Sequence, residues 1–322
     1  MIRYIRYLNF KALRDATLKL GSFTLLVGPN GSGKSTALGA LRYAAIRNGH
    51  NYDRIKTVGA EGSPEVRIGW TDPWSECRIE FTRGGGYTFQ FGPVHGSDED
   101  RFLKGARFFT FDAPAIARPV ALMPRAELES NGQNLAAVVD RLRDENPERF
   151  EKLNDDLNDW LPEFDRILLD TPGQGTRELR LRLSGTKVGI QTAEVSDGTL
   201  FALVLLTLAN LATPPTFVGI EEPDRGVHPR MLRRVQDALY RLSYPEQFED
   251  PRPAVQVVVT THSPFLLDLF RDRPEQIVIA ERKGAFAEFS QLVERSDIAQ
   301  LLGDASLGDL WYSGILGGVP PD

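Results

Sequence analysis

Cysteine is nearly absent from this sequence: Cys77 is the one cysteine among 322 residues. A single thiol can form neither an intramolecular disulfide nor a cysteine-cluster metal site, which fits a reducing compartment. Long apolar runs are missing too, because the longest mainly apolar stretch, residues 200–212, is well short of the ~20 residues that span a bilayer. The N-terminal segment contains Arg3 and Arg6 in place of the continuous apolar segment of a signal peptide. We therefore expect a cytoplasmic protein that does not enter the membrane.

An excess of basic residues is also missing, since the formal net charge is −6. This balance argues against a protein that coats nucleic acid non-specifically, although a local basic groove on an acidic body is compatible with it. The chain is 41% hydrophobic and 25% charged, which is ordinary for a globular protein. A chain of this length and composition can bury a sizeable core.

The most informative stretch is Gly-Pro-Asn-Gly-Ser-Gly-Lys-Ser-Thr at residues 28–36, which fits the G-x-x-x-x-G-K-[S/T] phosphate-binding pattern. An apolar run precedes it and a helical pattern follows, so a strand, a glycine-rich loop and a helix come in the required order. Lys34 is expected to reach the β- and γ-phosphates, and the Ser35 hydroxyl to hold Mg²⁺. The residues expected to contact the nucleotide here are Asn30, Gly31, Ser32, Gly33, Lys34, Ser35 and Thr36. The alternative, a glycine-rich turn that matches by chance, does not explain this order of elements.

Hydrophobic periodicity predicts the surrounding fold. Residues 1–27 fit three short strands, and residues 64–91 fit an antiparallel meander. Residues 125–162 fit two short amphipathic helices that form a small helical lobe, too short and too often interrupted by proline for a coiled-coil arm. From Ser196 onward, helices alternate with nearly continuous apolar strands, which indicates a parallel sheet covered on both faces. The predicted class is α/β, with a parallel core sheet, an antiparallel meander and the helical lobe.

Polar residues follow two of the predicted apolar strands. Glu221 and Glu222 end the strand 217–220, and ligands in open α/β sheets bind at the carboxyl ends of strands. Glu221 is placed to hold Mg²⁺, and Glu222 to orient and deprotonate the attacking water. His262 ends the next strand and is expected at the same edge, near the γ-phosphate. Taken alone, an acidic pair can begin a solvated loop, and a histidine can be a hydrogen-bonded bystander.

A third polar motif, Ser196-Asp197-Gly198, opens the long apolar helix before the acidic strand. The Ser196 side chain and the Gly198 amide at a helix N-terminus suit an anion, and the ordinary alternative is a simple N-cap. Because all of these motifs occur in one chain together with the phosphate loop, we interpret them as parts of one nucleotide site.

With the motifs in this order, the sequence resembles the ABC-type ATPase heads of the SMC/RecF/OLD group, most closely the small stand-alone AAA-type ATPases of that group. The matching parts, besides the phosphate loop, are Asn9-Phe10-Lys11, Ser196-Asp197-Gly198, Glu221-Glu222-Pro223-Asp224 with Val227-His228-Pro229, His262, residues 131–136 and the tail from Ser306. The resemblance covers nearly the whole chain and implies one ABC-type ATPase domain over residues 1–322. The first Walker B acid departs from the usual aspartate, and the Q-loop glutamine is unassigned, with Gln90 and Gln133 as candidates.

The resemblance implies ATP and Mg²⁺ as ligands and a head-to-tail homodimer, in which the phosphate loop of one copy and Ser196 of the other clasp each ATP. It further implies that Lys11 lies near the nucleotide and Asp224 at the dimer seam. The implied function is an ATPase switch: ATP closes the dimer, hydrolysis reopens it, and the cycle serves DNA repair, phage defence or a separate effector protein.

Other functions are disfavoured by missing motifs. An OLD-like nuclease needs an Asp-x-Asp pair in a further domain, and none follows His262. A transporter nucleotide-binding subunit normally carries Leu-Ser-Gly-Gly-Gln, where this chain has Val-Ser-Asp-Gly-Thr at 195–199, and a GTPase would carry Asn-Lys-x-Asp. The candidates for DNA contact, with a solvated charged face as the alternative, are Arg101, Lys104, Arg107, Arg230, Arg233 and Arg234.

Overall fold

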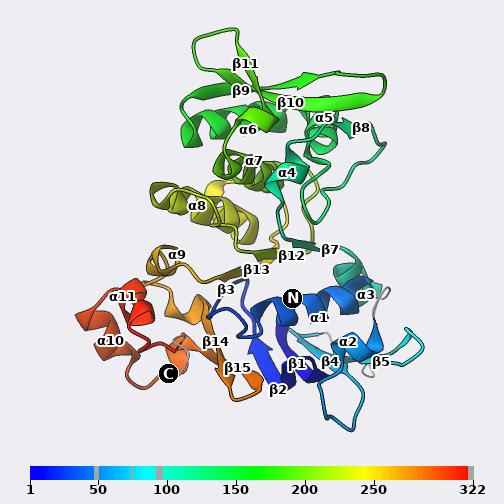
Figure 1. Cartoon of the computed structure of the whole chain (residues 1–322), viewed down its shortest axis with the longest axis vertical. Coiled ribbons are helices and arrows are strands. Elements are labelled where there is room, and N and C mark those ends of the chain that lie inside the picture. Colours follow the sequence, from blue (N-terminus) through cyan, green and yellow to red (C-terminus); the bar gives the residue numbers. More distant parts are fainter. Residues whose placement is uncertain (47–50, 74, 92–96, 318–322) are drawn as a thin grey trace. The chain divides into compact units, whose positions relative to one another are not determined.

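The computed structural model describes residues 1–46, 51–73, 75–91 and 97–317 (Figure 1). The chain forms two compact units. Unit 1 consists of Met1–Phe108, Pro215–Ile220 and Val255–Asp322, and unit 2 of Phe109–Pro214 and Glu221–Ala254. Because the segments of the two units alternate along the chain, neither unit is a continuous piece of sequence.

Unit 1 contains a six-stranded sheet with the order β15-β14-β3-β13-β12-β7. The strands β3 (Phe23–Val27), β13 (Gln256–Thr261) and β14 (Ile277–Lys283) run parallel, as the apolar runs predicted. All of the residues in β3 and β13 are buried, which is typical of strands covered on both faces. The remaining strands are β7 (Ala106–Phe109), β12 (Phe217–Glu221) and β15 (Phe286–Gln291). The sequence did not predict β15, which adds an antiparallel edge to the sheet.

A second, five-stranded sheet of unit 1 has the order β2-β1-β4-β5-β6 and is antiparallel throughout. Its strands are β1 (Ile2–Phe10), β2 (Leu13–Lys19), β4 (Glu65–Trp70), β5 (Cys77–Phe81) and β6 (Tyr87–Phe91). This confirms the predicted meander, with Cys77 buried as a free thiol. Helix α1 (Lys34–Ile46) packs on this sheet, where Tyr7 Oη donates to the carbonyl oxygen of Ala37 at 3.3 Å.

Gln256, which is 4% exposed, is one of the links between the two sheets. Its Nε2 donates to the carbonyl oxygens of Ile2 (2.7 Å) and Gly21 (2.9 Å), and its Oε1 accepts from Ile2 N (2.9 Å). The amide N–H groups and the amide oxygen of Gln256 all have hydrogen-bond partners. Gln256 therefore links strand β1 to strand β13 without leaving a buried polar group unpaired. The shorter helices of unit 1 are α2 (Tyr52–Ile55), α3 (Ser97–Lys104), α9 (Pro264–Asp268), α10 (Ile298–Asp304) and α11 (Leu307–Tyr312).

Unit 2 is organised around helix α7 (Asp197–Asn210), which is buried from Thr199 to Asn210. The helices α4 (Ala113–Ile116), α6 (Pro147–Trp160) and α8 (Leu232–Ser243) pack against it, and α5 (Leu135–Glu145) packs on α6. A small antiparallel sheet completes the unit, with strands β8 (Val120–Ala121), β9 (Phe164–Asp170), β10 (Thr176–Leu183) and β11 (Gly189–Gln191). In the described part of the chain, no helix has the length and apolar character needed to cross a membrane.

An arginine closes the C-terminal end of α7. The guanidinium of Arg252 donates to the carbonyl oxygens of Ala209 (2.6 Å) and Leu211 (2.7 Å), and to the carboxylate of Asp250. Arg149 binds the same carboxylate at 3.0 Å. Since the last carbonyl groups of a helix have no partner within the helix, this buried cluster satisfies part of the end of α7.

Candidate nucleotide site

The phosphate loop joins the end of β3 to the start of α1. Gly31 and Gly33 have φ angles of 77° and 94°, a left-handed conformation that glycine adopts without steric cost. A Cβ at Gly28 would lie 2.4 Å from Ser32 Oγ and 2.5 Å from the carbonyl oxygen of Ala280 on β14. The glycines are therefore required by backbone conformation and by close packing, and the loop is a defined structure rather than a chance match.

Lys34 is the first residue of α1 and is 6% exposed. Its Nζ donates to the carbonyl oxygens of Gly28 (2.5 Å) and Pro29 (2.9 Å). The ammonium group thus lies along the loop at the N-terminus of a helix, where the helix dipole adds to the positive potential. Ser35 follows it and is exposed, while the buried Ser32 Oγ finds no hydrogen-bond partner among the described residues. A lysine, a helix N-terminus and an unsatisfied hydroxyl fit a bound phosphate group.

His262 lies at the same edge of the sheet as the phosphate loop. Thr261 pairs with Val27 in the parallel strands β13 and β3, so His262 and Gly28 each follow directly after paired residues. His262 is exposed, and the backbone after it is fixed by Ser263, whose N–H donates to Thr261 Oγ1 at 3.0 Å and whose side chain caps α9. His262 therefore lies at the same sheet edge as the phosphate loop, as predicted from the sequence. Its contact with a γ-phosphate stays a prediction.

Lys11 lies in the turn between β1 and β2, with a φ of 49°. Its N–H donates to the carbonyl oxygen of Ile55 (2.7 Å), and its own carbonyl accepts from Thr57 Oγ1 (2.7 Å). Leu13, two residues further on, comes within 3.4 Å of the position that a Cβ would take at Gly33. The turn thus borders the phosphate loop within unit 1, and the role of Lys11 toward the nucleotide stays a prediction.

In unit 2, the two glutamates begin a tight turn that we call the acidic turn, residues 221–227. Glu221 is the last residue of β12, and Glu222 has a φ of 47°. The turn is closed by hydrogen bonds from Arg225 N to the carbonyl of Glu222 (3.1 Å) and from Val227 N to that of Asp224 (3.1 Å). A left-handed φ costs a residue with a side chain roughly 1–2 kcal/mol. Such strain persists where the surroundings hold it, and it is enriched at functional sites.

The acidic turn contacts the N-terminus of α7. A Cβ at Gly198 would lie 2.5 Å from the carbonyl oxygen of Gly226, so the turn and the helix approach each other closely at that point. Ser196 is the N-cap of α7, with its Oγ accepting from Thr199 N at 3.1 Å. It is also exposed, so a second molecule can reach it. The N-cap explanation is therefore correct for Ser196, and it does not exclude an anion site at the same helix end.

The predicted residues are divided between the units: the phosphate loop, Lys11 and His262 lie in unit 1, and the acidic turn with Ser196 and Gly198 lies in unit 2. Across the residues that the structure describes, no group of three or more His, Cys, Asp or Glu side chains could hold a metal. Nucleotide-bound Mg²⁺ is usually held by one or two protein oxygens together with phosphates and water, so this finding leaves Ser35 and Glu221 as predicted ligands.

The Q-loop glutamine remains unassigned. Gln133 makes local hydrogen bonds: its side-chain amide donates to the carboxylate of Glu129, and its backbone N–H donates to Asn131 Oδ1 at 3.1 Å. Gln90 lies exposed on β6. The sequence reasoning also missed Arg225, whose guanidinium donates to the carbonyl oxygen of Phe111 at 2.8 Å. The sequence feature that could have indicated Arg225 is its position directly after the acidic residues.

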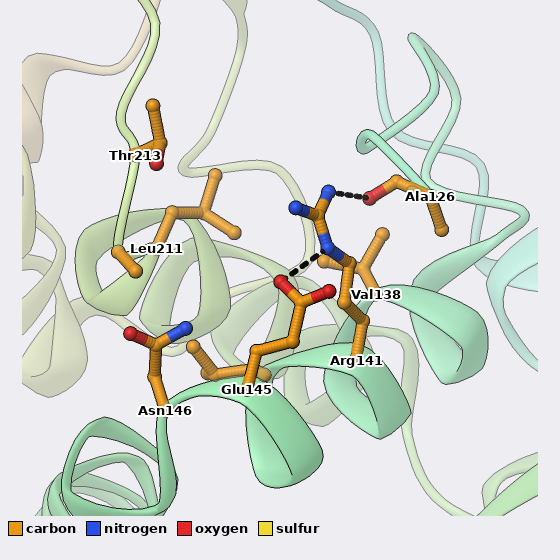
Figure 2. A pocket seen from close by; sticks show the side chains of 9 residues that line it. Ala126, Val138, Arg141, Glu145, Asn146, Leu211 and Thr213 are labelled. Carbon is orange, nitrogen blue, oxygen red and sulfur yellow. Dashed lines mark hydrogen bonds and ion pairs between the residues drawn. The ribbon is translucent and has the colours of Figure 1, made fainter. Parts of the chain in front are cut away.

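Unit 2 also has a small cavity, shown in Figure 2, with a volume of about 80 Å³. It lies beyond the C-terminal end of α7, next to Leu211, and Arg141 crosses it to bind Glu145 at 2.8 Å. Pockets for small molecules usually enclose several hundred Å³. The cavity is therefore too small for a nucleotide, and α7 separates it from Ser196 by roughly 20 Å at 1.5 Å per residue.

The phosphate loop on parallel strands, with an antiparallel sheet and a helical second unit, defines a P-loop ATPase with the fold of an SMC head. An Smc head domain with an extended coiled coil, derived from Pyrococcus furiosus and bound to the C-terminal domain of ScpA, has a TM-score of 0.65 and 15% identity. That match covers 94% of this chain and 99% of the other. The recombination mediator protein RecF of the RecFOR pathway matches with a TM-score of 0.51 and 12% identity, covering 90% of this chain and 98% of its own. At these identities the likeness shows the fold alone.

Family models match both halves of the chain. An AAA domain model matches residues 4–109, and the model of the family "AAA domain, putative AbiEii toxin, Type IV TA system" matches residues 91–268. Since the second match covers more than half of the chain, the protein belongs to that family. UvrABC system protein A of Deinococcus radiodurans is 27% identical over an alignment of 273 positions, which covers 71% of this chain and 25% of that relative. The fold class and the resemblance expected from the sequence are confirmed.

Proposed function

We propose that this protein is an ATP-hydrolysing switch in which two copies dimerise head to tail around ATP. The observation that carries the proposal is the phosphate loop, where the buried Lys34 ammonium lies on the carbonyls of Gly28 and Pro29 at the N-terminus of α1. A charged group held there costs free energy to bury, and a polyphosphate offsets that cost by direct charge pairing.

The remaining residues have separate roles in this proposal. The loop amides and Lys34 bind the β- and γ-phosphates, and Ser35 with Glu221 hold Mg²⁺, which neutralises phosphate charge when bound. Glu222 accepts a proton from the attacking water, and His262 contacts the γ-phosphate at the edge it shares with the loop. Lys11 supplies a further positive charge beside the loop.

Ser196 and Gly198 act on the nucleotide of the partner copy. Two observations support this role. The N-terminus of α7 is exposed, and the N–H groups and dipole at a helix N-terminus favour a bound anion. Asp224 lies in the acidic turn next to this helix end and so belongs to the proposed dimer seam. The sandwich arrangement, including one ATPase domain over residues 1–322, is part of the proposal.

The wider role is also proposed, from what the relatives are called. UvrABC system protein A and RecF point to DNA repair, and the family description points to a toxin–antitoxin system and hence to phage defence. The Smc head bound to part of ScpA points to a separate effector protein. We place the switch in the cytoplasm, in keeping with the single cysteine.

Contact with DNA has weaker support from the side chains. Arg101 and Lys104 pair with Asp98 (3.6 Å) and Asp100 (2.7 Å) on their own helix. Arg107 donates to backbone carbonyls, one of them that of Lys104 at 2.8 Å. On α8, Arg234 binds the carboxylate of Asp159, while Arg230 and Arg233 are exposed. We therefore test DNA as an activator of turnover and do not make it a condition of the switch.

Complementation between two inactive variants tests the sandwich. Lys34→Ala removes the phosphate-binding lysine, and Ser196→Arg blocks the exposed helix cap, so each homodimer lacks both sites. In a mixed dimer, one site combines the intact loop of one copy with the intact Ser196 of the other. We expect roughly a quarter of wild-type ATP turnover in an equimolar mixture, since half of the dimers are mixed and each has one intact site.

Two further measurements accompany the complementation assay. The first is the mass of the protein in solution with ATP and Mg²⁺, and the second is ATP turnover with and without single- and double-stranded DNA. A dimer that forms only with ATP, and activity restored by mixing, support the sandwich. Ser196→Arg protein that turns over ATP at the wild-type rate would rule it out. Turnover unchanged by either form of DNA would remove DNA from the proposed role and leave the switch in place.

A further inference from the structure

Glu222 occupies a backbone conformation that has to be held in place. Its φ of 47° is unfavourable for a residue with a side chain, and the position lies directly at the end of β12. The hydrogen bonds from Arg225 N to Glu222 and from Val227 N to Asp224 are local to the acidic turn, and turn bonds of this kind contribute only about 1 kcal/mol each. Strained residues are held in place by their surroundings, so contacts that anchor the turn from outside help to keep Glu222 in one conformation.

Arg225 supplies such a contact. Its N–H closes the turn on the carbonyl of Glu222, and its guanidinium leaves the turn to donate to the carbonyl oxygen of Phe111 at 2.8 Å. The same guanidinium lies over the ring of Phe201, with Cζ 5.5 Å from the ring centroid. A planar guanidinium can make a hydrogen bond at its edge and a cation–π contact on its face simultaneously. One side chain thus fastens the turn to two different parts of unit 2.

Both anchor points are themselves buried. Phe111 is 5% exposed, and its neighbours donate backbone hydrogen bonds to residues 130 and 131, from Thr110 N (2.8 Å) and Asp112 N (3.1 Å). Residue 131 begins the sequence motif 131–136, and Gly132 within that motif, at a φ of 79°, packs against Ile116. The motif thus supports the carbonyl that Arg225 binds.

Phe201 connects the same arginine to the helix that begins at Ser196. It is 4% exposed on α7, five residues after the N-cap, and its ring stacks with that of Phe111 at 6.3 Å between centroids. Movement of the α7 N-terminus therefore changes the surface on which the guanidinium lies. The side chain links the conformation of Glu222 to the helix end proposed to bind the partner's nucleotide.

We propose that Arg225 is a positioning residue for ATP hydrolysis, which holds the carboxylate of Glu222 in its working direction by joining the acidic turn to Phe111 and Phe201. The inference rests on the proposed role of Glu222 as the base. It requires no contact between Arg225 and the nucleotide. Its consequence is that Arg225 affects the chemical step and leaves ATP binding nearly unchanged.

A double-mutant cycle in the full chain tests this. The variants are Arg225→Ala, Glu222→Ala and both together. The control is Arg166→Ala, which removes a different arginine of unit 2, one whose guanidinium makes two hydrogen bonds to the carboxylate of Glu151 (3.1 and 2.6 Å). We expect Arg225→Ala to lower kcat roughly 10- to 100-fold, as misplacement of a catalytic group does, with the KM for ATP within about threefold. In the Glu222→Ala background it should cause no further loss.

The outcomes separate this inference from the function it rests on. Turnover that is unaffected by Glu222→Ala overturns the base role and the inference with it. A large effect of Glu222→Ala, combined with an Arg225→Ala effect that is absent or fully additive in the double variant, overturns the inference alone. Arg225→Lys keeps a donor for the carbonyl of Phe111 but loses the planar face. A kcat between those of Arg225→Ala and the wild type therefore supports the inference. If Arg225→Ala does not fold, Phe201→Leu replaces it in the cycle, with the same non-additivity expected.

Discussion

The strained backbone of Glu222 leads to a prediction in which glycine is more stable than alanine at this position, although both variants lose activity. At a φ of 47°, alanine keeps the unfavourable conformation of glutamate, whereas glycine does not. Glycine saves roughly 1–2 kcal/mol of steric strain in the folded state. It loses about 0.5–1 kcal/mol through the greater entropy of its unfolded chain. We therefore expect Glu222→Gly to be more stable than Glu222→Ala by roughly 0–1.5 kcal/mol, centred on about 0.75 kcal/mol.

The neighbouring residue provides a control of opposite sign. Glu221 lies in β12, where extended backbone suits any residue with a Cβ, so Glu221→Gly should be less stable than Glu221→Ala by about 0.5–1 kcal/mol. Thermal unfolding of the four variants measures both differences. At 1 kcal/mol, a chain of this size shifts its Tm by about 2 °C. The glycine and alanine variants at one position lose the same carboxylate. The difference in stability between them therefore reports the effect of backbone conformation alone.

Turnover is measured on the same proteins. Glu222→Gly, Glu222→Ala and Glu222→Gln should each reduce ATP turnover by roughly 10²–10⁴-fold, the usual contribution of a general base, while ATP binding is retained. Glu222→Gln should also accumulate the ATP-bound dimer. A Glu222→Gly protein that is less stable than Glu222→Ala would refute the argument from strain, and unchanged turnover in Glu222→Gln would remove Glu222 from its role.

Three further predictions concern other parts of the chain. Lys34→Ala should abolish ATP binding measured by calorimetry, because the loop loses its one positive side chain. Gly198→Ala places a Cβ 2.5 Å from the carbonyl of Gly226, so ATP binding should be retained and ATP-dependent dimerisation should weaken about tenfold or more, measured by sedimentation. Burial raises the pKa of Asp250, but hydrogen bonds from Arg252 and Arg149 outweigh it and hold the pKa well below its usual range. Because the folded-state pKa is depressed, the stabilisation is fully present above the unfolded pKa of about 4 and is lost progressively as the pH falls from there toward the folded pKa. Asp250→Asn should therefore destabilise the protein by roughly 3–5 kcal/mol at pH 7 and by about 1 kcal/mol less at pH 3 in chemical unfolding.

The parts of the site that were predictable are those encoded by short contiguous segments. The phosphate loop needs glycines, a lysine and a helix within nine residues, and the structure shows the conformational reason for each glycine. His262 was predictable as an edge residue because an apolar strand ends just before it, and parallel strands end at the same side. The meander followed from alternation with a period of two.

The parts that were missed depend on residues far apart in the sequence. Strand β15 has two phenylalanines but no regular apolar face, and pairing with β14 defines it as a strand. Gln256 looks like an ordinary polar residue, and its role appears only when Ile2 and Gly21 are brought to it. Arg225 is likewise unremarkable in sequence, since Phe111 and Phe201 reach it from distant segments.

The sequence by itself determined the chemistry available to this protein: a phosphate loop, an acidic pair, a histidine and a helix cap, each specified by neighbouring residues whose backbone preferences are local. Only the tertiary structure decided which of these groups share a unit, and that Glu222 is held in a left-handed conformation by a turn that Arg225 fastens to α7. The physical reason is that a strained conformation is maintained by contacts from distant segments, whose approach is set by packing of the whole unit and leaves no pattern in the local sequence.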